Sequence, residues 1–268
     1  MKNPPKNLAG RWAIVTGASS GIGEQFAIAL GQMDMNLVII SNQPDQLAKV
    51  ADYIVYEYDV KVHALDIDLG SHDAVERITS FLDSNAIEVT FLVNNAGIFN
   101  FSPVSKLSDK RINLYIDLHM RTVTLLCTAI AKRMVNGDGG YILNMSSMSC
   151  WMPMPGIALY SSTKAYIRAF SRALRIELKD YGVSVTTACP GGIATDLFGL
   201  KDNLKRLGVG LGVLATPEKF AHKAIKKTLK GKAQYINGLI NRFSIVFVAS
   251  LPEWFRLKAS RYIFNRMK

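Results

Sequence analysis

A short glycine-rich stretch near the start of the chain constrains its fold more than any other feature. Residues 16–23 read Thr-Gly-Ala-Ser-Ser-Gly-Ile-Gly, follow the apolar run Trp12–Val15 and lead into a helical pattern. Gly17 permits a tight turn, Gly21 lets backbone N–H groups approach a pyrophosphate, and Gly23 lets the helix pack closely on the sheet. Because a phosphate is stabilised at a helix N-terminus, the pattern predicts a strand–turn–helix unit that binds a dinucleotide.

The rest of the chain repeats this alternation of short apolar runs and longer amphipathic stretches. We expect strands at Trp12–Thr16, Leu37–Ser41, Lys61–Leu65, Val89–Asn94, Tyr141–Met145, Ser184–Ala188 and Gln234–Ile236. We expect helices at Gly23–Met33, Asp45–Tyr56, Ser71–Leu82, Asp109–Met134 and Ala158–Tyr181. The order predicts one α/β domain, a doubly wound (Rossmann-type) parallel sheet of about seven strands with helices on both faces.

Positive charge is concentrated toward the C-terminus. The chain has 32 basic and 21 acidic residues, a net charge of +11, and residues 239–268 combine basic with large apolar side chains. That combination fits an anionic membrane surface better than a nucleic acid, and a solvated face that keeps the protein soluble is the alternative. The apolar run 243–251 is too short to span a bilayer, which needs about 20 residues. We therefore separate a main domain, 1–238, from a basic amphipathic extension, 239–268, and expect no nucleic-acid partner.

The cysteines and histidines are scattered along the chain. No C-x-x-C pair or metal-ligand spacing occurs among Cys127, Cys150, Cys189, His63, His72, His119 and His222. The sequence therefore predicts neither a disulfide framework nor a metal site. Reduced cysteines and an N-terminal stretch without an apolar signal run predict a cytoplasmic location, with membrane association through the extension as an open alternative.

Tyr160 and Lys164 are four residues apart in a helical pattern, so they share one face of the helix. A nearby ammonium lowers the pKa of a tyrosine, so the pair could transfer a proton near neutral pH. Three further motifs, 144–147, 94–97 and 190–195, follow predicted strands. The carboxyl ends of parallel strands meet at one edge of the sheet, where ligands bind. We therefore expect all these motifs to form one cleft.

The second predicted strand ends in Ser41-Asn42-Gln43, without an acid. A carboxylate at this place would bind the ribose 2′-hydroxyl of NAD. Its absence favours NADP(H) over NAD(H), because a 2′-phosphate would meet no negative charge. Neither Asn42 nor Gln43 is an arginine, so no positive charge adds to this preference.

In this order and spacing, from Arg11 to Thr195, the motifs resemble those of the short-chain dehydrogenase/reductase family. The resemblance implies a nicotinamide-cofactor enzyme, usually a homo-oligomer, that interconverts a ketone and a secondary alcohol. It implies Tyr160 as the general acid/base, Lys164 as its partner on the nicotinamide ribose, and Ser147 as a hydrogen-bond donor to the substrate oxygen. The cofactor site that it implies comprises Gly17, Ser19, Ser20, Gly21, Ile22, Gly23, Ser41, Asn42, Asp68, Asn94, Ala96, Gly97, Tyr160, Lys164, Pro190, Gly191, Ile193 and Thr195.

Two of the implied positions have alternative interpretations. Asp68 matches an aspartate near the adenine, but it could also be a cap acid ahead of Ser71. His119 replaces the asparagine that this family usually places in its fourth long helix, where it supports a proton-relay water. His119 could preserve the relay and add pH sensitivity, since histidine titrates near neutrality. Alternatively, it is a structural histidine between packed helices, and an impaired relay would make the chain a cofactor-binding sensor or scaffold.

The region after the sixth predicted strand offers a substrate site. Residues 196–215 form a long stretch, rich in glycine and leucine, of the kind that often closes over ligands. The segment 150–155 adds sulfur and aromatic surface beside Ser147. Both predict a lipophilic carbonyl or alcohol substrate, such as a steroid or a long-chain 3-oxo lipid.

Overall fold

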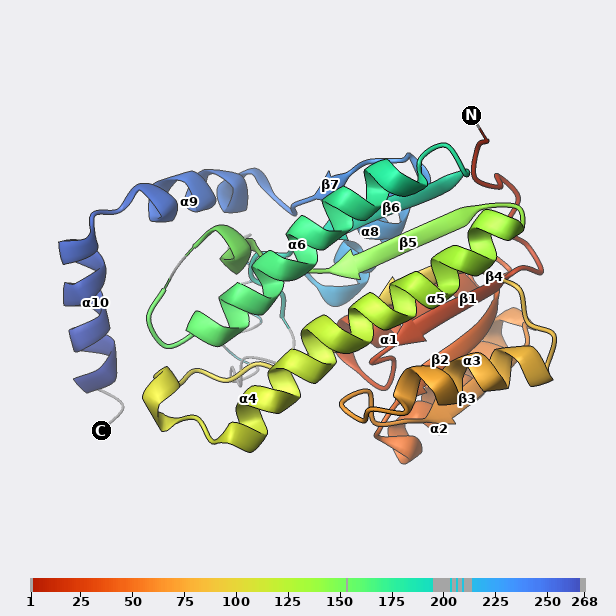
Figure 1. Ribbon diagram of the computed structural model, residues 1–268, viewed down its shortest axis with the longest axis horizontal. Helices are drawn as coiled ribbons and strands as arrows, with labels where there is room; N and C mark the ends of the chain where they lie inside the picture. Colours follow the sequence, from red (N-terminus) through yellow and green to blue (C-terminus); the bar gives the residue numbers. More distant parts are fainter. Residues whose placement is uncertain are drawn as a thin grey trace.

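The computed structural model describes residues 2–152, 154–194 and 214–265, together with positions 203, 206 and 209. Within these residues one sheet of seven parallel strands has the order β3-β2-β1-β4-β5-β6-β7 (Figure 1). Its strands are β1 Trp12–Thr16, β2 Asn36–Ser41, β3 Val62–Asp66, β4 Val89–Asn94, β5 Gly140–Met145, β6 Val183–Ala188 and β7 Gln234–Tyr235. The predicted doubly wound fold is confirmed, and the chain order reverses between β1 and β4, where such folds bind ligands.

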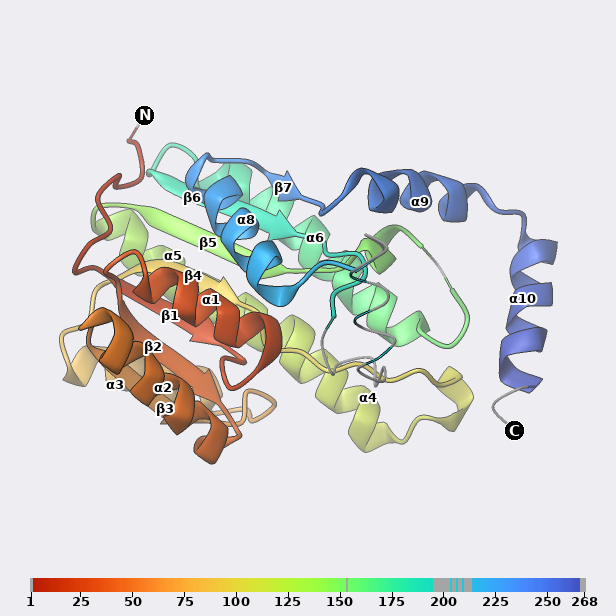
Figure 2. The same cartoon turned by 180° about the vertical axis from the view of Figure 1, so that it is seen from behind.

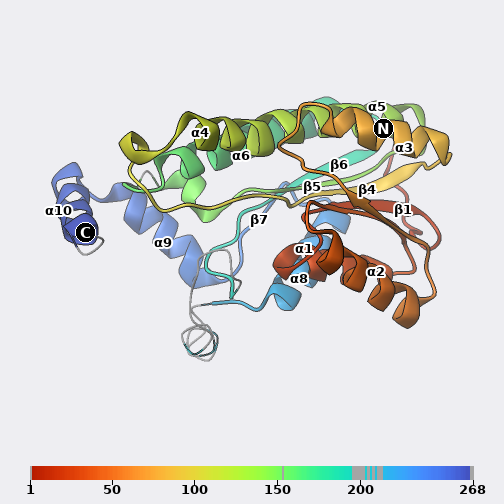
Figure 3. The same ribbon diagram turned by 90° about the horizontal axis from the view of Figure 1, so that it is seen from below.

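Helices cover both faces of the sheet, as the view from behind and the view from below show (Figure 2, Figure 3). One face carries α1 (Gly21–Gly31), α2 (Pro44–Tyr58) and α8 (Pro217–Leu229). The other carries α3 (Ala74–Ser84), α5 (Thr122–Asn136) and α6 (Ala158–Leu178), and α4 (Asp109–Ile116) continues the line of α5 beyond the sheet. The inner strands are therefore buried on both faces, which explains why they read as apolar runs rather than as alternating patterns, whereas the edge strand β3 is partly exposed.

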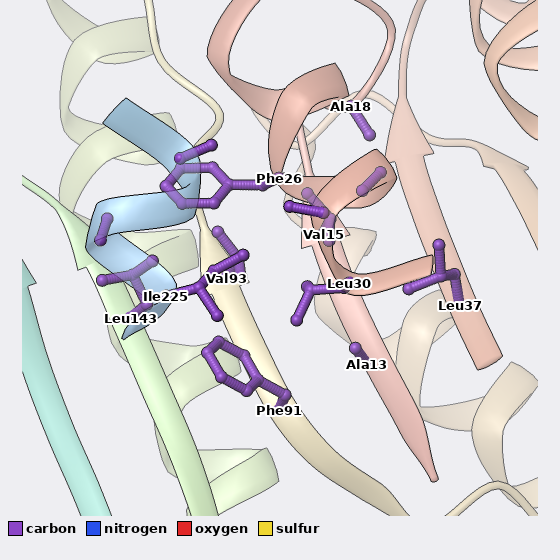
Figure 4. Close-up of a cluster of buried hydrophobic side chains, with 14 of the residues drawn as sticks. Ala13, Val15, Ala18, Phe26, Leu30, Leu37, Phe91, Val93, Leu143 and Ile225 are labelled. Atoms are coloured by element: carbon purple, nitrogen blue, oxygen red, sulfur yellow. The ribbon is translucent and has the colours of Figure 1, made fainter. Parts of the chain in front are cut away.

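The two faces of the sheet have separate apolar cores. Ala13 and Val15 of β1 point toward α1 and α8, where they join Phe26, Leu30 and Ile225 (Figure 4). Ile14, between them in the sequence, belongs to the core on the opposite face. This alternation along a strand fixes the register of the sheet, because a slip of one residue would exchange the two faces.

Several helical features differ from the sequence prediction, which also did not include α9 (Leu239–Ser250) and α10 (Glu253–Asn265) as helices. Helix α8 was not predicted, although Thr216 caps it by accepting a hydrogen bond from the N–H of Lys219 and Pro217 is its first residue. The predicted helix from Asp109 contains a π turn, η2 (Asp117–Arg121), between α4 and α5. The stretch Asp109–Asn136 is long and apolar enough to cross a membrane, but half of its most apolar window is buried within the fold.

The C-terminal helices α9 (Leu239–Ser250) and α10 (Glu253–Asn265) extend past β7 to the far end of the molecule (Figure 1). Helix α9 packs on the short 3-10 helix η3 (Met148–Trp151), which follows Ser147. The division of the chain at residue 238 stays a prediction. Most of the predicted substrate loop, 196–215, lies outside the described residues.

Candidate active site

The glycine turn has the geometry that a pyrophosphate requires. Gly17 and Gly21 have positive φ angles of 65° and 61°, a conformation that favours glycine. A Cβ on Gly23 would overlap the carbonyl oxygen of Gly17, and a Cβ on Gly17 would lie 2.8 Å from the Cα of Ala96. Helix α1 begins at Gly21, so its free N–H groups face the turn. The turn therefore offers a close, positively polarised cradle for phosphate.

A cleft of about 500 Å³ runs from this turn along the carboxyl edge of the sheet. It brings together most of the predicted cofactor residues, namely Gly17, Ser19, Ser20, Gly21, Ile22, Gly23, Ser41, Asn42, Asp68, Ala96 and Gly97. Asn95, within the predicted motif 94–97, also lines the cleft, as does Gln43, which was not among the predicted cofactor residues. Asn95 is held there because the hydroxyl of Thr16 accepts its N–H at 2.9 Å and its amide donates to the carbonyl of Thr16 at 3.0 Å.

Asn94 does not contribute its side chain to the cleft, which corrects the predicted role. Its amide donates to Asn144 Oδ1 at 2.8 Å and contacts Cys127 Sγ at 3.1 Å. Asn144 in turn donates to Ser171 Oγ at 2.9 Å, which links β4, β5 and α6. Side chains alternate along a strand, so the last residue of β4 faces the core and Asn95, the next residue, faces the cleft.

The end of the cleft beside β2 carries neutral polar groups. The Ser41 hydroxyl donates to Ser19 Oγ at 2.9 Å and accepts the N–H of Gln43 at 3.2 Å. Among the described residues that line the cleft, none is basic and Asp68 is the one acid. Asp68 accepts the N–H of Gly70 at 2.9 Å, whereas α3 begins only at Ala74, so Asp68 does not cap that helix.

A smaller pocket of about 70 Å³ adjoins the cleft and holds Ser147, Tyr160 and Lys164. Pro190, Gly191 and Ile193 also line it, as predicted. The pocket and the cleft share the residues Ile22, Asn95, Gly97 and Ile98. They therefore form one continuous site. The predicted Thr195 lies outside the described residues.

Two hydrogen bonds hold α6 against the end of β5. The ammonium of Lys164 donates to the carbonyl of Met145 at 3.0 Å, and the hydroxyl of Ser146 donates to the carbonyl of Lys164 at 2.7 Å. Burial lowers the pKa of Lys164 from 10.5 to about 8, because a charged ammonium is costly away from water. Lys164 nevertheless remains mostly charged at neutral pH.

Tyr160 is buried beside Lys164, and burial raises its pKa from 10.0 to about 12, although a hydrogen bond with Ser147 opposes the shift. This differs from the expectation that Lys164 would lower the pKa of the tyrosine. The ammonium lies 5.7 Å from the centre of the Tyr160 ring and is bonded to Met145 instead. Burial therefore dominates, and Tyr160 is a protonated phenol at neutral pH.

His119 lies beneath the site, fully buried in the π turn. Its Nε2 accepts the N–H of Ile98 at 3.0 Å, so Nδ1 carries the proton and lies 2.9 Å from the hydroxyl of Thr163. Burial, and then the charges of Lys164 and Arg111, hold its pKa well below the ordinary value. Both ring nitrogens are engaged by the protein and the ring is neutral, so the geometry favours the structural interpretation over a pH-sensitive relay.

An aromatic side chain that sequence reasoning missed packs on Tyr160. The ring of Phe99 meets the Tyr160 ring edge to face, with 5.1 Å between the ring centres. The loop that carries Phe99 is anchored to the segment before α6, because the N–H of Ser102 donates to the carbonyl of Gly156 at 2.8 Å. No sequence motif marks this loop, although its three large apolar residues at positions 98, 99 and 101 could have indicated that it packs on the protein.

Two cysteines that are distant in the sequence meet beside the pocket. The thiols of Cys150 and Cys189 are hydrogen-bonded to each other, and this bond is the main cause of a lowered pKa at Cys150 and a raised pKa at Cys189. Both are free thiols, as is Cys127. Cys127 is fully buried, and burial raises its pKa to about 12.

Comparison with known proteins adds to this geometry. Residues 11–204 match the family model described as short chain dehydrogenase. The very-long-chain 3-oxoacyl-CoA reductase of Homo sapiens is 32% identical over 255 residues, which are 93% of this chain and 78% of that protein. The inactive hydroxysteroid dehydrogenase-like protein 1 of Homo sapiens is 30% identical over 248 residues, 91% of this chain and 73% of that protein. A solved short-chain dehydrogenase from Sphingobium yanoikuyae in complex with NADPH has a TM-score of 0.77 at 25% identity, covering 91% of this chain and 97% of that one.

The structural interpretation of His119 predicts a loss of stability. We expect His119→Ala to lower the free energy of unfolding by about 2 kcal/mol, because the N–H of Ile98 loses its acceptor and a cavity remains. Urea unfolding measures this change, with the exposed His222→Ala as the control. The pH profiles of turnover should keep the same shape in both variants. A pH inflection near 6.5 that only His119→Ala removes would contradict this interpretation.

Proposed function

Because this chain belongs to the short-chain dehydrogenase family, we propose that it is an oxidoreductase that reduces the ketone of a lipophilic substrate with NADPH. The observation that carries this proposal is the meeting of Ser147, Tyr160 and Lys164 in a pocket that opens into the dinucleotide cleft. The glycine cradle and the N-terminus of α1 suit a pyrophosphate. The pocket suits a carbonyl group, because two hydroxyls and a cation converge on it.

The chemistry follows from the protonation states of the pocket. A bound nicotinamide cofactor supplies a hydride to the carbonyl carbon. Tyr160, with its pKa near 12, gives its proton to the carbonyl oxygen as negative charge develops there. Ser147 donates a second hydrogen bond to the same oxygen, and the charge of Lys164 stabilises the phenolate that remains. A protonated tyrosine at neutral pH favours reduction, since alcohol oxidation would need the phenolate.

A lipid-like carbonyl compound, either a long-chain 3-oxo thioester or a steroid, is the substrate class that we propose. The human relative at 32% identity is named for very-long-chain 3-oxoacyl-CoA reduction. Ile98, Met145 and Ile193 line the pocket together with Tyr160 and Ser147, and the ring of Phe99 packs on Tyr160. Such walls suit a substrate that leaves water when it binds.

The proposed preference for NADPH rests on the end of the cleft beside β2. Ser41, Asn42 and Gln43 line it without a carboxylate that would repel a 2′-phosphate. The similar solved structure from Sphingobium yanoikuyae holds NADPH. Hydroxyl and amide groups at this end can donate hydrogen bonds to a phosphate.

A second candidate is a cofactor-binding protein without turnover. The similarity to the inactive hydroxysteroid dehydrogenase-like protein 1 favours it. The complete set of Ser147, Tyr160 and Lys164 argues for the enzyme instead. Tight NADPH binding without oxidation of NADPH by any of a panel of ketones, 3-oxosteroids and 3-oxoacyl thioesters would establish this second candidate.

Removal of the Tyr160 hydroxyl tests the role of the phenol. We expect Tyr160→Phe to lower kcat by about 100-fold or more, because the hydroxyl that gives its proton to the carbonyl oxygen is lost. The affinity for NADPH should change less than about threefold, since the ring and its packing remain. Stopped-flow absorbance and NADPH fluorescence titration measure the two effects, with the exposed Tyr181→Phe as the matched control. Near-normal turnover in Tyr160→Phe would refute the proposed mechanism.

The pKa of Lys164 predicts the pH dependence of reduction. The ammonium is charged below its pKa of about 8 and neutral above it, so its stabilisation of the phenolate is lost as the pH rises. We expect kcat/KM for NADPH, which reports ionisations of the free enzyme, to be level near pH 7 and to fall above about pH 8. Tyr160 stays protonated over this range and does not cause the fall. A level profile up to about pH 9.5 would show that Lys164 does not titrate there.

A single charge at the end of β2 tests the cofactor preference. We expect Asn42→Asp, which adds a carboxylate of equal size, to raise KM for NADPH about tenfold or more and to leave KM for NADH unchanged or lower. Steady-state kinetics with both cofactors measures the ratio, with Asn42→Leu as the uncharged control. An equal rise in KM for NADPH in Asn42→Asp and Asn42→Leu would mean that no phosphate lies beside Asn42.

A further inference from the structure

The two C-terminal helices each expose large apolar side chains. On α9, Leu239, Ile240, Phe243, Val246 and Phe247 are 62–73% exposed, and we call these five residues the apolar stripe. At 100° per residue they fall within one side of the helix, whereas the buried Ile245 lies on the opposite side, toward the body of the protein. On α10, Trp254, Phe255 and Leu257 are 43–64% exposed. Contiguous exposure of this kind marks an interaction surface.

A basic hollow of about 420 Å³ lies where the apolar stripe meets α8. Its cations are Lys223, Lys226 and Lys227 from α8 and Arg242 from α9, and Leu239 of the stripe lines the same hollow. Within the described part of the chain, none of these cations forms an ion pair with a carboxylate. The hollow can therefore attract an anion, and it places that anion directly beside apolar side chains.

The charge of this surface discriminates between its candidate occupants. A second copy of the chain that paired through the same face would bring the four cations of one hollow close to those of the other. Helix α10 adds the exposed Lys258 and Arg261, with Glu253 as its acid. An anionic phospholipid bilayer instead matches both parts of the surface, since lipid phosphates pair with the cations and the acyl boundary accepts the apolar side chains.

We propose that α8, α9 and α10 form a docking surface for an anionic phospholipid membrane. A lipid headgroup phosphate binds in the basic hollow, and the apolar stripe inserts at the boundary between headgroups and acyl chains. Trp254 of α10 lies at the same interface, where the amphipathic ring of tryptophan is favoured.

This surface is joined to the candidate active site. The side chain of Asn241 on α9 fills the space in which Gly191 would carry a Cβ, and Gly191 donates its N–H to Asn237 Oδ1 at 2.7 Å. Helix α9 also packs on η3, which begins directly after Ser147. A membrane under α9 would therefore lie beside the pocket. Entry of a lipid substrate from the bilayer rests on the proposed function, whereas the docking itself does not.

Vesicle sedimentation of the full chain tests the docking. We expect binding to phosphatidylcholine vesicles with about 30 mol% phosphatidylserine to be at least about tenfold stronger than binding to phosphatidylcholine alone, and to weaken as salt is added. Lys226→Glu/Lys227→Glu and Phe243→Asp/Phe247→Asp should each weaken binding about tenfold or more. The matched controls, Lys49→Glu/Lys61→Glu and Tyr56→Asp/Ile176→Asp, alter exposed residues elsewhere and should bind like the natural chain.

Other outcomes of the same experiment would overturn the proposal. The proposal would fail if the natural chain did not bind the anionic vesicles. It would also fail if Lys226→Glu/Lys227→Glu bound them as strongly as the control Lys49→Glu/Lys61→Glu. Conversion of a dimer to a monomer by Phe243→Asp/Phe247→Asp in analytical ultracentrifugation, without vesicle binding, would show that a second copy covers the stripe. Reduction of a water-soluble ketone is measured in parallel. Its absence would count against the proposed function and leave the vesicle result unaffected.

Discussion

Two hydrogen bonds between the end of β5 and α6 determine where the reactive groups lie. The hydroxyl of Ser146 donates to the carbonyl of Lys164, and the ammonium of Lys164 donates to the carbonyl of Met145. Both bonds are buried, so water does not compete for their partners. Ser147 follows Ser146, and Tyr160 lies one helical turn before Lys164. The separation of the two hydroxyls is therefore set by the strand and the helix rather than by a loop. His119 links α6 to the cleft in the same way, because its ring is hydrogen-bonded both to Thr163 and to the N–H of Ile98.

The same arrangement explains the protonation states on which the proposed chemistry depends. Burial acts in opposite directions on the two groups, since it raises the pKa of Tyr160 and lowers that of Lys164. The result at neutral pH is a protonated phenol beside a cation, which is the pair that reduction of a carbonyl needs. An ammonium has three donors, and Met145 takes one of them. A ribose hydroxyl in the cleft could accept another, which suits a nicotinamide cofactor.

Much of the fold and of the site could be predicted because local residue types decide them. The glycine turn, the parallel strands and the Tyr160–Lys164 spacing depend on positive φ angles, burial and helical period, all of which a sequence displays. The side-chain direction of Asn94 and the contact between Cys150 and Cys189 depend on tertiary packing, and so they could not be read from the chain. The pKa of Tyr160 was misjudged for a similar reason, because spacing shows that a cation is near but not how deeply the phenol is buried. Helix α8 was not predicted, although Thr216 as a cap residue and Pro217 as the first helical residue mark its start in the sequence.

Isotope transfer tests the central claim, that this site moves a hydride from NADPH to a lipid-like carbonyl group. The enzyme is incubated with NADPH deuterated at the reactive face of C4 and with a 3-oxoacyl thioester or a 3-oxosteroid, and the product is examined by mass spectrometry. We predict one deuterium on the carbinol carbon of the product, and about 100-fold less of this product in the same time when Tyr160→Phe replaces the natural chain. Absence of deuterated alcohol from every substrate of the panel, in a protein that binds NADPH, would contradict the claim.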